Sequence, residues 1–327
     1  MRGSRSSFAT ACCSASLAVA CARGGGDAGR DGSARAAQEA AIATSDGGGA
    51  RSSDASAAQT YATADPVRAK SIGHTSYVLK LTLEGGRVVV YKPRSKLPLG
   101  DHRYKGEIAA YRLATALGLD NVQPAMPRAF AADTLRAVVD GFDAKGRVDD
   151  DGMVRGALMP WLDTYRVLPL EEDAWRKQWE PWVLAPHASI PDSERARAAS
   201  ISTMIVFDYL TANWDRWSGG NVAEDSATGK VLFVDNDGAF YEAPDPALLK
   251  RQLAFVQRVA RFSRRFVAAL RGLDAATIGA ALGDEYPGVP LVSARVVDGV
   301  DARRRAAIDA IDARVRDAGD GATLAFE

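Results

Sequence analysis

The sequence predicts an α+β fold with two lobes, a small β-rich N-lobe and a larger helical C-lobe. Strand-like runs occupy residues 74–92, whereas helix-like patterns occupy residues 200–214, 249–272 and 301–317. The 327 residues, 47% of them hydrophobic, suit one large or two modest domains with a full core. Lys plus Arg equals Asp plus Glu at 41 each, so no net field attracts nucleic acid, and we expect no nucleic-acid partner.

The first 21 residues have the layout of a secretory signal. Arg2 and Arg5 precede an apolar run over residues 8–20, and small residues lead up to Cys21. The segment resembles a bacterial lipoprotein signal, which implies that Cys21 is lipidated and anchors the chain to a membrane of the cell envelope. Plain secretion and a disordered cytosolic tail are the alternatives. All three cysteines lie here, so we expect no disulfide and no thiol nucleophile in the folded part.

Residues 22–65 are rich in Gly, Ala, Ser, Asp and Arg and have almost no large apolar side chain. Such a segment buries too little apolar surface to offset the entropy of ordering, so we expect a flexible tether. The N-lobe would then span residues 66–160, and the C-lobe residues 161–327.

The N-lobe is expected to begin with a β-hairpin that ends at Lys92. Residues 74–83 and 88–92 are strand-like, and residues 84–87 have the composition of a turn. Lysines on strands are usually solvated, so Lys92 alone indicates little.

A helix is expected to follow over residues 105–118, with Glu107 in its first turn and Gly118 as its C-terminal stop. An acid in a first helical turn usually serves the helix dipole. The order of the two residues is more specific than either one. In protein kinases a strand lysine holds the ATP phosphates, and a glutamate of the next helix fixes that lysine.

Residues 154–162 are an apolar strand with a proline near its end, and we interpret them as the hinge between the lobes. The backbone at Met159 would then be available to the edge of an adenine. All six tryptophans lie between Trp161 and Trp217. They form either an aromatic wall beside a substrate groove or the packing of the C-lobe.

The C-lobe carries the residues with the clearest chemistry. A helix is expected over residues 200–214, and a loop with two glycines separates it from a buried strand over residues 230–234. The polar residues of interest lie on this loop and directly after the strand: Asp215, Arg216, Asn221, Asp235 and Asp237. Kinase sites present a catalytic aspartate and two metal ligands in this order.

These motifs resemble the atypical kinase superfamily that includes the secretory-pathway casein kinases of the Golgi, the type II phosphatidylinositol 4-kinases and bacterial HipA-like kinases. The resemblance is carried by residues 207–216 (FDYLTANWDR), residues 234–236 (VDN) and Phe240. Residues 90–93 (VYKP) and 107–114 (EIAAYRLA) are similar to the lysine and helix motifs of the same group. The resemblance implies a protein-kinase-like fold.

The resemblance also implies roles for single residues. Lys92 would contact the α and β phosphates of ATP, and Glu107 would anchor Lys92. Asp215 would orient and deprotonate the acceptor hydroxyl, while Asn221 and Asp235 would hold Mg2+ or Mn2+.

Phosphoryl transfer itself requires these residue types. It needs a fixed cation at the phosphates, hard oxygen ligands for the metal and one carboxylate near the nucleophile. Asp237 is a further candidate ligand, although Asp-Asn-Asp-Gly is also an ordinary tight turn.

We therefore expect an atypical kinase that moves the γ-phosphate of ATP to a hydroxyl, with a protein as the first choice of acceptor. A lipid headgroup or small molecule comes next, and a non-catalytic pseudokinase of the envelope is the competing class. Residues 249–272 carry seven basic side chains and no acid. This run suits an acidic protein substrate or an anionic lipid headgroup, or it is a solvated helix face.

Overall fold

The computed structural model describes residues 61–73 and 75–327. The predicted signal segment, residues 1–21, and residues 22–60 of the predicted tether lie outside the described residues. Lipidation of Cys21 therefore stays a prediction. Among the residues that the structure describes, none of the helices combines the length and apolar character needed to cross a membrane.

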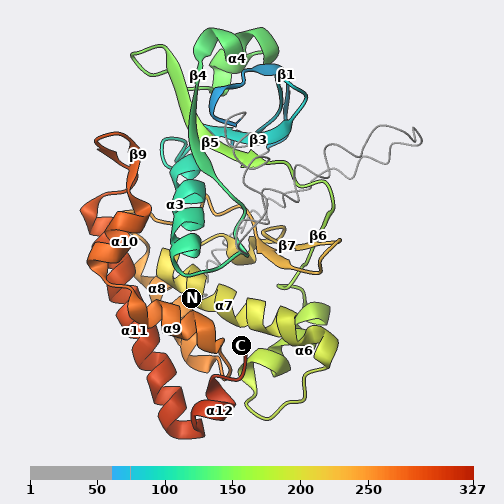
Figure 1. The fold of residues 1–327 in the computed structure, drawn as a ribbon, viewed down its shortest axis with the longest axis vertical. Helices are drawn as coiled ribbons and strands as arrows, with labels where there is room; N and C mark the ends of the chain where they lie inside the picture. The colour runs from blue at the N-terminus through green and yellow to red at the C-terminus, as the bar shows by residue number, and fades with distance from the viewer. Residues whose placement is uncertain (1–60, 74) are drawn as a thin grey trace, which may run out of the picture.

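The N-terminal region is built on one five-stranded antiparallel sheet (Figure 1). The predicted hairpin is confirmed, since Leu79 pairs with Tyr91 across it, but its first strand starts at Leu79 and not at residue 74, and β1 precedes it. Side chains of β3 alternate between the two faces: Val89 and Tyr91 join an outer hydrophobic cluster, whereas Lys92 faces the interior of the molecule. In spatial order the strands are β1 (Pro66–Ser71), β2 (Leu79–Leu83), β3 (Val88–Pro93), β5 (Met153–Pro160) and β4 (Met126–Ala131).

Helix α3 (Arg103–Ala116) follows β3 and lies between the sheet and the C-terminal helices (Figure 1). Gly118 ends it as predicted: the N–H groups of Gly118 and Leu119 bond back to Thr115 and Ala114. The predicted start at residue 105 was too late, so Glu107 lies in the second turn and not in the first. Tertiary contacts hold the first turn in place of a side-chain cap, because Arg103 is bonded to the Pro98 carbonyl oxygen and to Asp237.

The C-terminal region packs its helices around α7 (Arg195–Thr211), whose residues 201–211 are all buried. We predicted this helix over residues 200–214, but it ends at Thr211 because Ala212 adopts a left-handed backbone, with φ at 52°. The basic run 249–272 is divided between α8 (Pro246–Arg258) and α9 (Arg264–Gly272).

The remaining elements complete the two regions. A three-stranded sheet in the order β6–β7–β8 lies beside α7 (Figure 1). The helix predicted over residues 301–317 belongs to α11. Their bounds are α4 (Ala132–Val138), α5 (Phe142–Lys145), β6 (Tyr165–Val167), α6 (Asp173–Leu184), β7 (Val222–Asp225), β8 (Val231–Phe233), α10 (Ala275–Leu282), β9 (Asp284–Tyr286), β10 (Val289–Pro290), α11 (Ala294–Ala318) and α12 (Asp320–Thr323), with single-turn 3-10 helices at Asp192–Glu194 and Arg216–Ser218.

Two hydrophobic clusters divide the molecule. The smaller one lies between the outer face of the five-stranded sheet and α4, and it includes Phe130 and Leu135. The larger one fills the helical region and extends to α3, because Ile108 and Leu113 belong to the same cluster as Leu282. The predicted fold class, α+β with a β-rich N-lobe and a larger helical C-lobe, is confirmed.

Candidate active site

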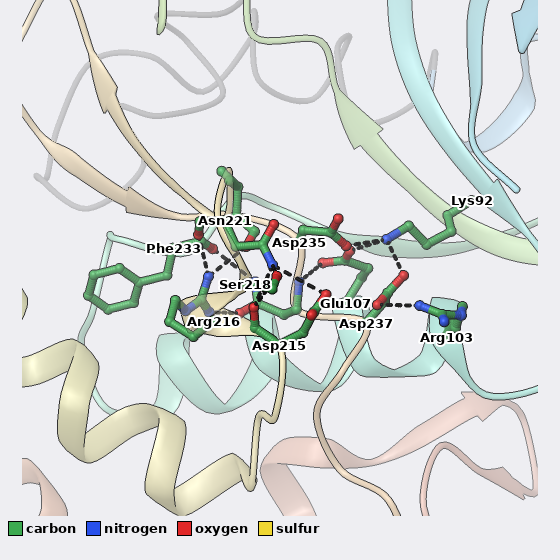
Figure 2. A network of polar contacts seen from close by, with 12 residues as sticks. Lys92, Arg103, Glu107, Asp215, Arg216, Ser218, Asn221, Phe233, Asp235 and Asp237 are labelled. Carbon is green, nitrogen blue, oxygen red and sulfur yellow. Dashed lines mark hydrogen bonds and ion pairs between the residues drawn. The ribbon is translucent and has the colours of Figure 1, made fainter. Parts of the chain in front are cut away.

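Lys92 is the cation around which the site is built. Its Nζ donates to Glu107 Oε1 at 2.7 Å, to Asp235 Oδ1 at 2.8 Å and to Asp237 Oδ2 at 2.9 Å (Figure 2). Only 4% of the Lys92 side chain is exposed. Burial by itself lowers the pKa of Lys92, but the three carboxylates raise it, and the net pKa lies well above the ordinary value. The amine is therefore a fixed positive charge.

Helix α3 contributes two side chains to this cluster from one face. Glu107 bonds Lys92 with one carboxylate oxygen and accepts from the backbone N–H of Asn236 with the other, at 3.0 Å. Arg103, four residues earlier, donates to Asp237 Oδ1 at 2.9 Å. The helix thus fixes both Lys92 and the segment that carries Asp235 and Asp237.

Asp235 follows β8 in a backbone conformation that L-residues rarely adopt, with φ at 53°. Such strain is concentrated at functional sites, where it aims a side chain that an extended backbone would direct elsewhere. Burial, and then the charge of Asp237, raises the pKa of Asp235 to about 7. In contrast, Lys92 and Arg103 outweigh burial at Asp237 and lower its pKa.

The loop after α7 places Asp215 and Asn221 side by side. The Asn221 amide nitrogen donates to the backbone carbonyl oxygen of Asp215 at 2.8 Å and to its Oδ2 at 3.3 Å (Figure 2). Gly219 and Gly220 allow this return of the chain, because both have a positive φ, 98° and 84°. Burial is the main cause that raises the pKa of Asp215 above its ordinary value. A raised pKa makes this half-buried carboxylate a better proton acceptor.

Arg216 connects the loop that carries Asp215 and Asn221 with the segment that carries Asp235. Its buried guanidinium donates to the Asp208 carboxylate at 3.1 Å on α7, and to the carbonyl oxygens of Asn221 and Val234. It also donates to the side-chain oxygen of Asn236. One side chain therefore joins α7, the loop after it and the end of β8.

The charges of the cluster fit a divalent cation. When all four are ionised, the carboxylates of Glu107, Asp215, Asp235 and Asp237 exceed the two nearby cations, Lys92 and Arg103, by two charges. Carboxylate and amide oxygens are the ligands that Mg2+ and Mn2+ prefer. Within the described residues, no group of three or more acidic, His or Cys side chains is already arranged around a cation position. The carboxylates of Glu107, Asp235 and Asp237 bind the Lys92 amine instead.

A cavity opens beside Lys92 under the five-stranded sheet. Apolar side chains of Ile72, Val78, Val90 and Met159 line it, and Lys92 and Asp235 are also in its wall. An apolar slot with a few polar groups suits a flat heterocycle. Met159 is 5% exposed and contributes its side chain.

The backbone of Met159 is oriented differently from our prediction. Met159 pairs with Val90 in the sheet. On either side of this pair, the Arg94 N–H donates to the Arg155 carbonyl oxygen and the Trp161 N–H donates to the Val88 carbonyl oxygen. Hydrogen-bonded and non-bonded residue pairs alternate between these bonds, which makes Met159 and Val90 a hydrogen-bonded pair. The same alternation directs the N–H and C=O of Met159 toward β3. The backbone of Met159 is therefore occupied within the sheet, and only its side chain lines the cavity.

The tryptophans serve mainly to pack the C-lobe. Trp179 stacks on Trp217 with ring centroids 5.8 Å apart, and both rings contact Phe255 on α8. Trp214 differs, because it is 45% exposed directly before Asp215. Trp161 differs as well, because it lines the cavity beside Lys92, so the interpretation as an aromatic wall applies at most to these two residues.

The sequence motifs missed Arg103, and Asp237 was only an alternative ligand. Arg103 was placed in a loop because the helix start was predicted too late, although its spacing of four from Glu107 would have put both on one helix face. Asp237 is 1% exposed and is bonded by two cations, so it is a full member of the cluster.

No protein-family model matches the chain. No curated protein matches it either.

Solved structures do resemble this one. A Golgi casein kinase matches with 12% sequence identity and a TM-score of 0.59, over 80% of this chain and 76% of that one. A Golgi casein kinase with Mn/ADP bound matches at 13% identity and a TM-score of 0.59, over 81% and 77% of the two chains. A hydra Fam20 structure with sugar matches at 16% identity and a TM-score of 0.59, over 81% and 90%. The chain therefore has the fold of these secretory-pathway kinases.

Proposed function

We propose that the chain is an ATP-dependent phosphotransferase that moves the γ-phosphate to a hydroxyl of a protein. The observation that carries this proposal is the cluster itself: a buried lysine held by a helix glutamate and by the aspartate after β8, with a second aspartate on the neighbouring loop. The kinase fold and the Mn/ADP complex of a protein with that fold support it. A pure binding module would have no need of all four charged residues.

Each residue has a role that follows from its position. Lys92 neutralises the α and β phosphates, and Glu107 keeps its amine in place. Asp235 and Asn221, with Asp237 as an alternative, would hold Mg2+ or Mn2+, which supplies charge neutralisation at the phosphates when bound. The acceptor oxygen forms a bond to the γ-phosphorus as the bond to the β–γ bridging oxygen breaks and ADP leaves. Asp215 takes the proton of the acceptor hydroxyl.

The surface next to Asp215 supports an acidic protein as the acceptor. Gln252 of α8 donates to the Asn213 carbonyl oxygen at 2.7 Å, so α8 directly adjoins the loop that carries Asp215. Lys250 and Arg251 directly precede Gln252 on α8 and are exposed. Other basic residues of the run have partners of their own: Arg261 is buried against backbone carbonyls, and Arg264 and Arg271 form ion pairs with Asp320 and Asp312.

Transfer of label from ATP tests the function. We expect that ATP labelled at the γ position, with Mn2+, labels acidic protein acceptors, and that Asp215→Ala removes this labelling. ATP labelled at the α position should leave every acceptor unlabelled, because label from that position would indicate nucleotidyl transfer. A panel of acidic proteins, lipid headgroups and small alcohols identifies the acceptor class. Absence of Asp215-dependent transfer to all of them would contradict the proposal and favour a pseudokinase.

A further inference from the structure

Helix α3 presents two faces to two different parts of the molecule. Arg103 and Glu107 are four residues apart and face the site. Tyr104 and Arg112 are eight residues apart, about 2.2 turns, and both contact the segment from α10 to β9. In a rigid helix, whatever fixes the second face also sets the direction of the first.

Glu285, on β9, contacts the first turn of α3 with both carboxylate oxygens. The Tyr104 hydroxyl donates to Oε1 at 2.7 Å, and Lys105 Nζ lies 2.9 Å from Oε2. The Glu285 side chain is 3% exposed, and Tyr104 is equally buried. A carboxylate that is shielded from water and shared between two donors makes a strong, directional contact.

A second anchor lies about two turns farther along the helix. Arg112 donates to the carbonyl oxygen of Asp284 at 2.8 Å and to that of Leu282, the last residue of α10. These carbonyl oxygens lie at a helix end and a strand start, where such groups would otherwise lack partners. Two anchors separated by roughly 12 Å along the helix fix both the rotation and the axial position of α3.

We propose that Glu285 is a positioning residue for catalysis: it holds α3 in the rotation at which Glu107 meets Lys92. The effect on catalysis rests on the proposed function, whereas the effect on the Lys92–Glu107 pair does not. The C-lobe, through β9, therefore determines whether Lys92 of the N-lobe is bonded to Glu107.

Two measurements on the full chain without nucleotide test the proposal. The first is the rate at which an amine-reactive reagent modifies Lys92, read by mass spectrometry, and the second is hydrogen exchange in α3. Glu285→Ala removes a hydrogen bond to a charged group, so we expect Lys92 labelling and α3 exchange to become about tenfold faster. Tyr104→Phe should have a smaller effect in the same direction. Glu285→Gln keeps an acceptor for Tyr104 and should restore part of the protection.

Asp312→Ala is the matched control, because it breaks the exposed ion pair of Asp312 with Arg271, away from α3. It should leave both rates unchanged. Unchanged rates in Glu285→Ala would overturn the proposal, and so would faster exchange spread evenly over both lobes, which would make Glu285 a general structural residue. Because neither measurement uses phosphate transfer, a chain that proves inactive as a kinase still gives a clear answer.

Discussion

Glu224 shows how one buried charge supports the site from outside it. It lies on β7, three residues after Asn221, and its carboxylate contacts Arg166 on β6 at 2.8 Å and Arg197 on α7 at 2.6 Å. Burial alone would raise the pKa of Glu224, but the hydrogen bond and charge of Arg197, and then those of Arg166, lower it overall. Glu224 therefore stabilises the folded chain when it is ionised.

This direction gives a pH dependence with a defined sign. A carboxyl whose pKa is lowered on folding contributes stability above its unfolded pKa, and that contribution is lost as the pH falls through the folded pKa. Glu224→Gln should lower the free energy of unfolding by about 1–3 kcal/mol at pH 7. In denaturant unfolding the difference should shrink as the pH falls below 4.5, the ordinary value.

Glu180→Gln is the matched control, because Glu180 pairs with Arg176 across one exposed helix turn. It should change stability by less than about 0.5 kcal/mol. A Glu224→Gln effect that stays constant from pH 7 down to pH 3 would show that packing, and not charge, accounts for the loss.

At the same scale, the sequence indicated most of the polar residues that meet at Lys92 but not their partners. Glu107, Asp235 and Asp215 could be named because their order along the chain matches a known chemistry. Arg103 could not, because no capping side chain marks the start of α3. Two of the three partners of Lys92, Asp235 and Asp237, lie 143 and 145 residues farther along the chain. No local sequence pattern predicts contacts over such a separation.

At the scale of elements, the approach of α3 to the segment after β8 depends on Gly106. A Cβ at this position would lie 2.7 Å from the Asn236 carbonyl oxygen and 3.2 Å from the Asp237 Cα. Both atoms belong to backbone, so the segment would have to move away from the helix. That movement would separate Asp235 and Asp237 from Lys92.

Gly106→Ala should therefore weaken binding of Mn2+·ATP by at least about tenfold, although alanine is intrinsically better in a helix by about 1 kcal/mol. Fluorescence titration with a labelled nucleotide measures the affinity. Gly279→Ala on α10 is the control, since its Cβ would meet only Val297 at an ordinary 3.7 Å. It should raise stability slightly and leave the affinity unchanged. Equal affinities in the two variants would contradict the role of this close approach.

The sequence predicted the longer elements better than the short ones. The β2–β3 hairpin and α11 carry clear periodicity or turn composition. In contrast, β6 has three residues and β4 contains a proline, so neither shows strand alternation, and pairing with neighbouring strands defines them. Pro181 inside α6 likewise interrupts the pattern by which helices are identified.

At the scale of the whole molecule, the residues of the candidate site come from both the five-stranded sheet and the helical region. Lys92 comes from the sheet, Asp215 and Asn221 from the loop after α7, and Asp235 from the end of β8. Because α3 packs into the hydrophobic cluster of the helical region, the sheet alone does not fix the site. Under the proposed function the two aspartates have separate roles: Asp235 would bind the metal–nucleotide complex, and Asp215 would act on the acceptor.

The affinity for Mn2+·ATP, measured by titration calorimetry on the wild-type chain and two isosteric variants, tests this division most directly. Asp215→Asn should bind within about threefold of wild type, because Asp215 does not hold the metal in this account. Asp235→Asn should bind at least about 100-fold more weakly, since it removes a ligand of the metal. Equal loss in both variants, or wild-type affinity in Asp235→Asn, would contradict the account.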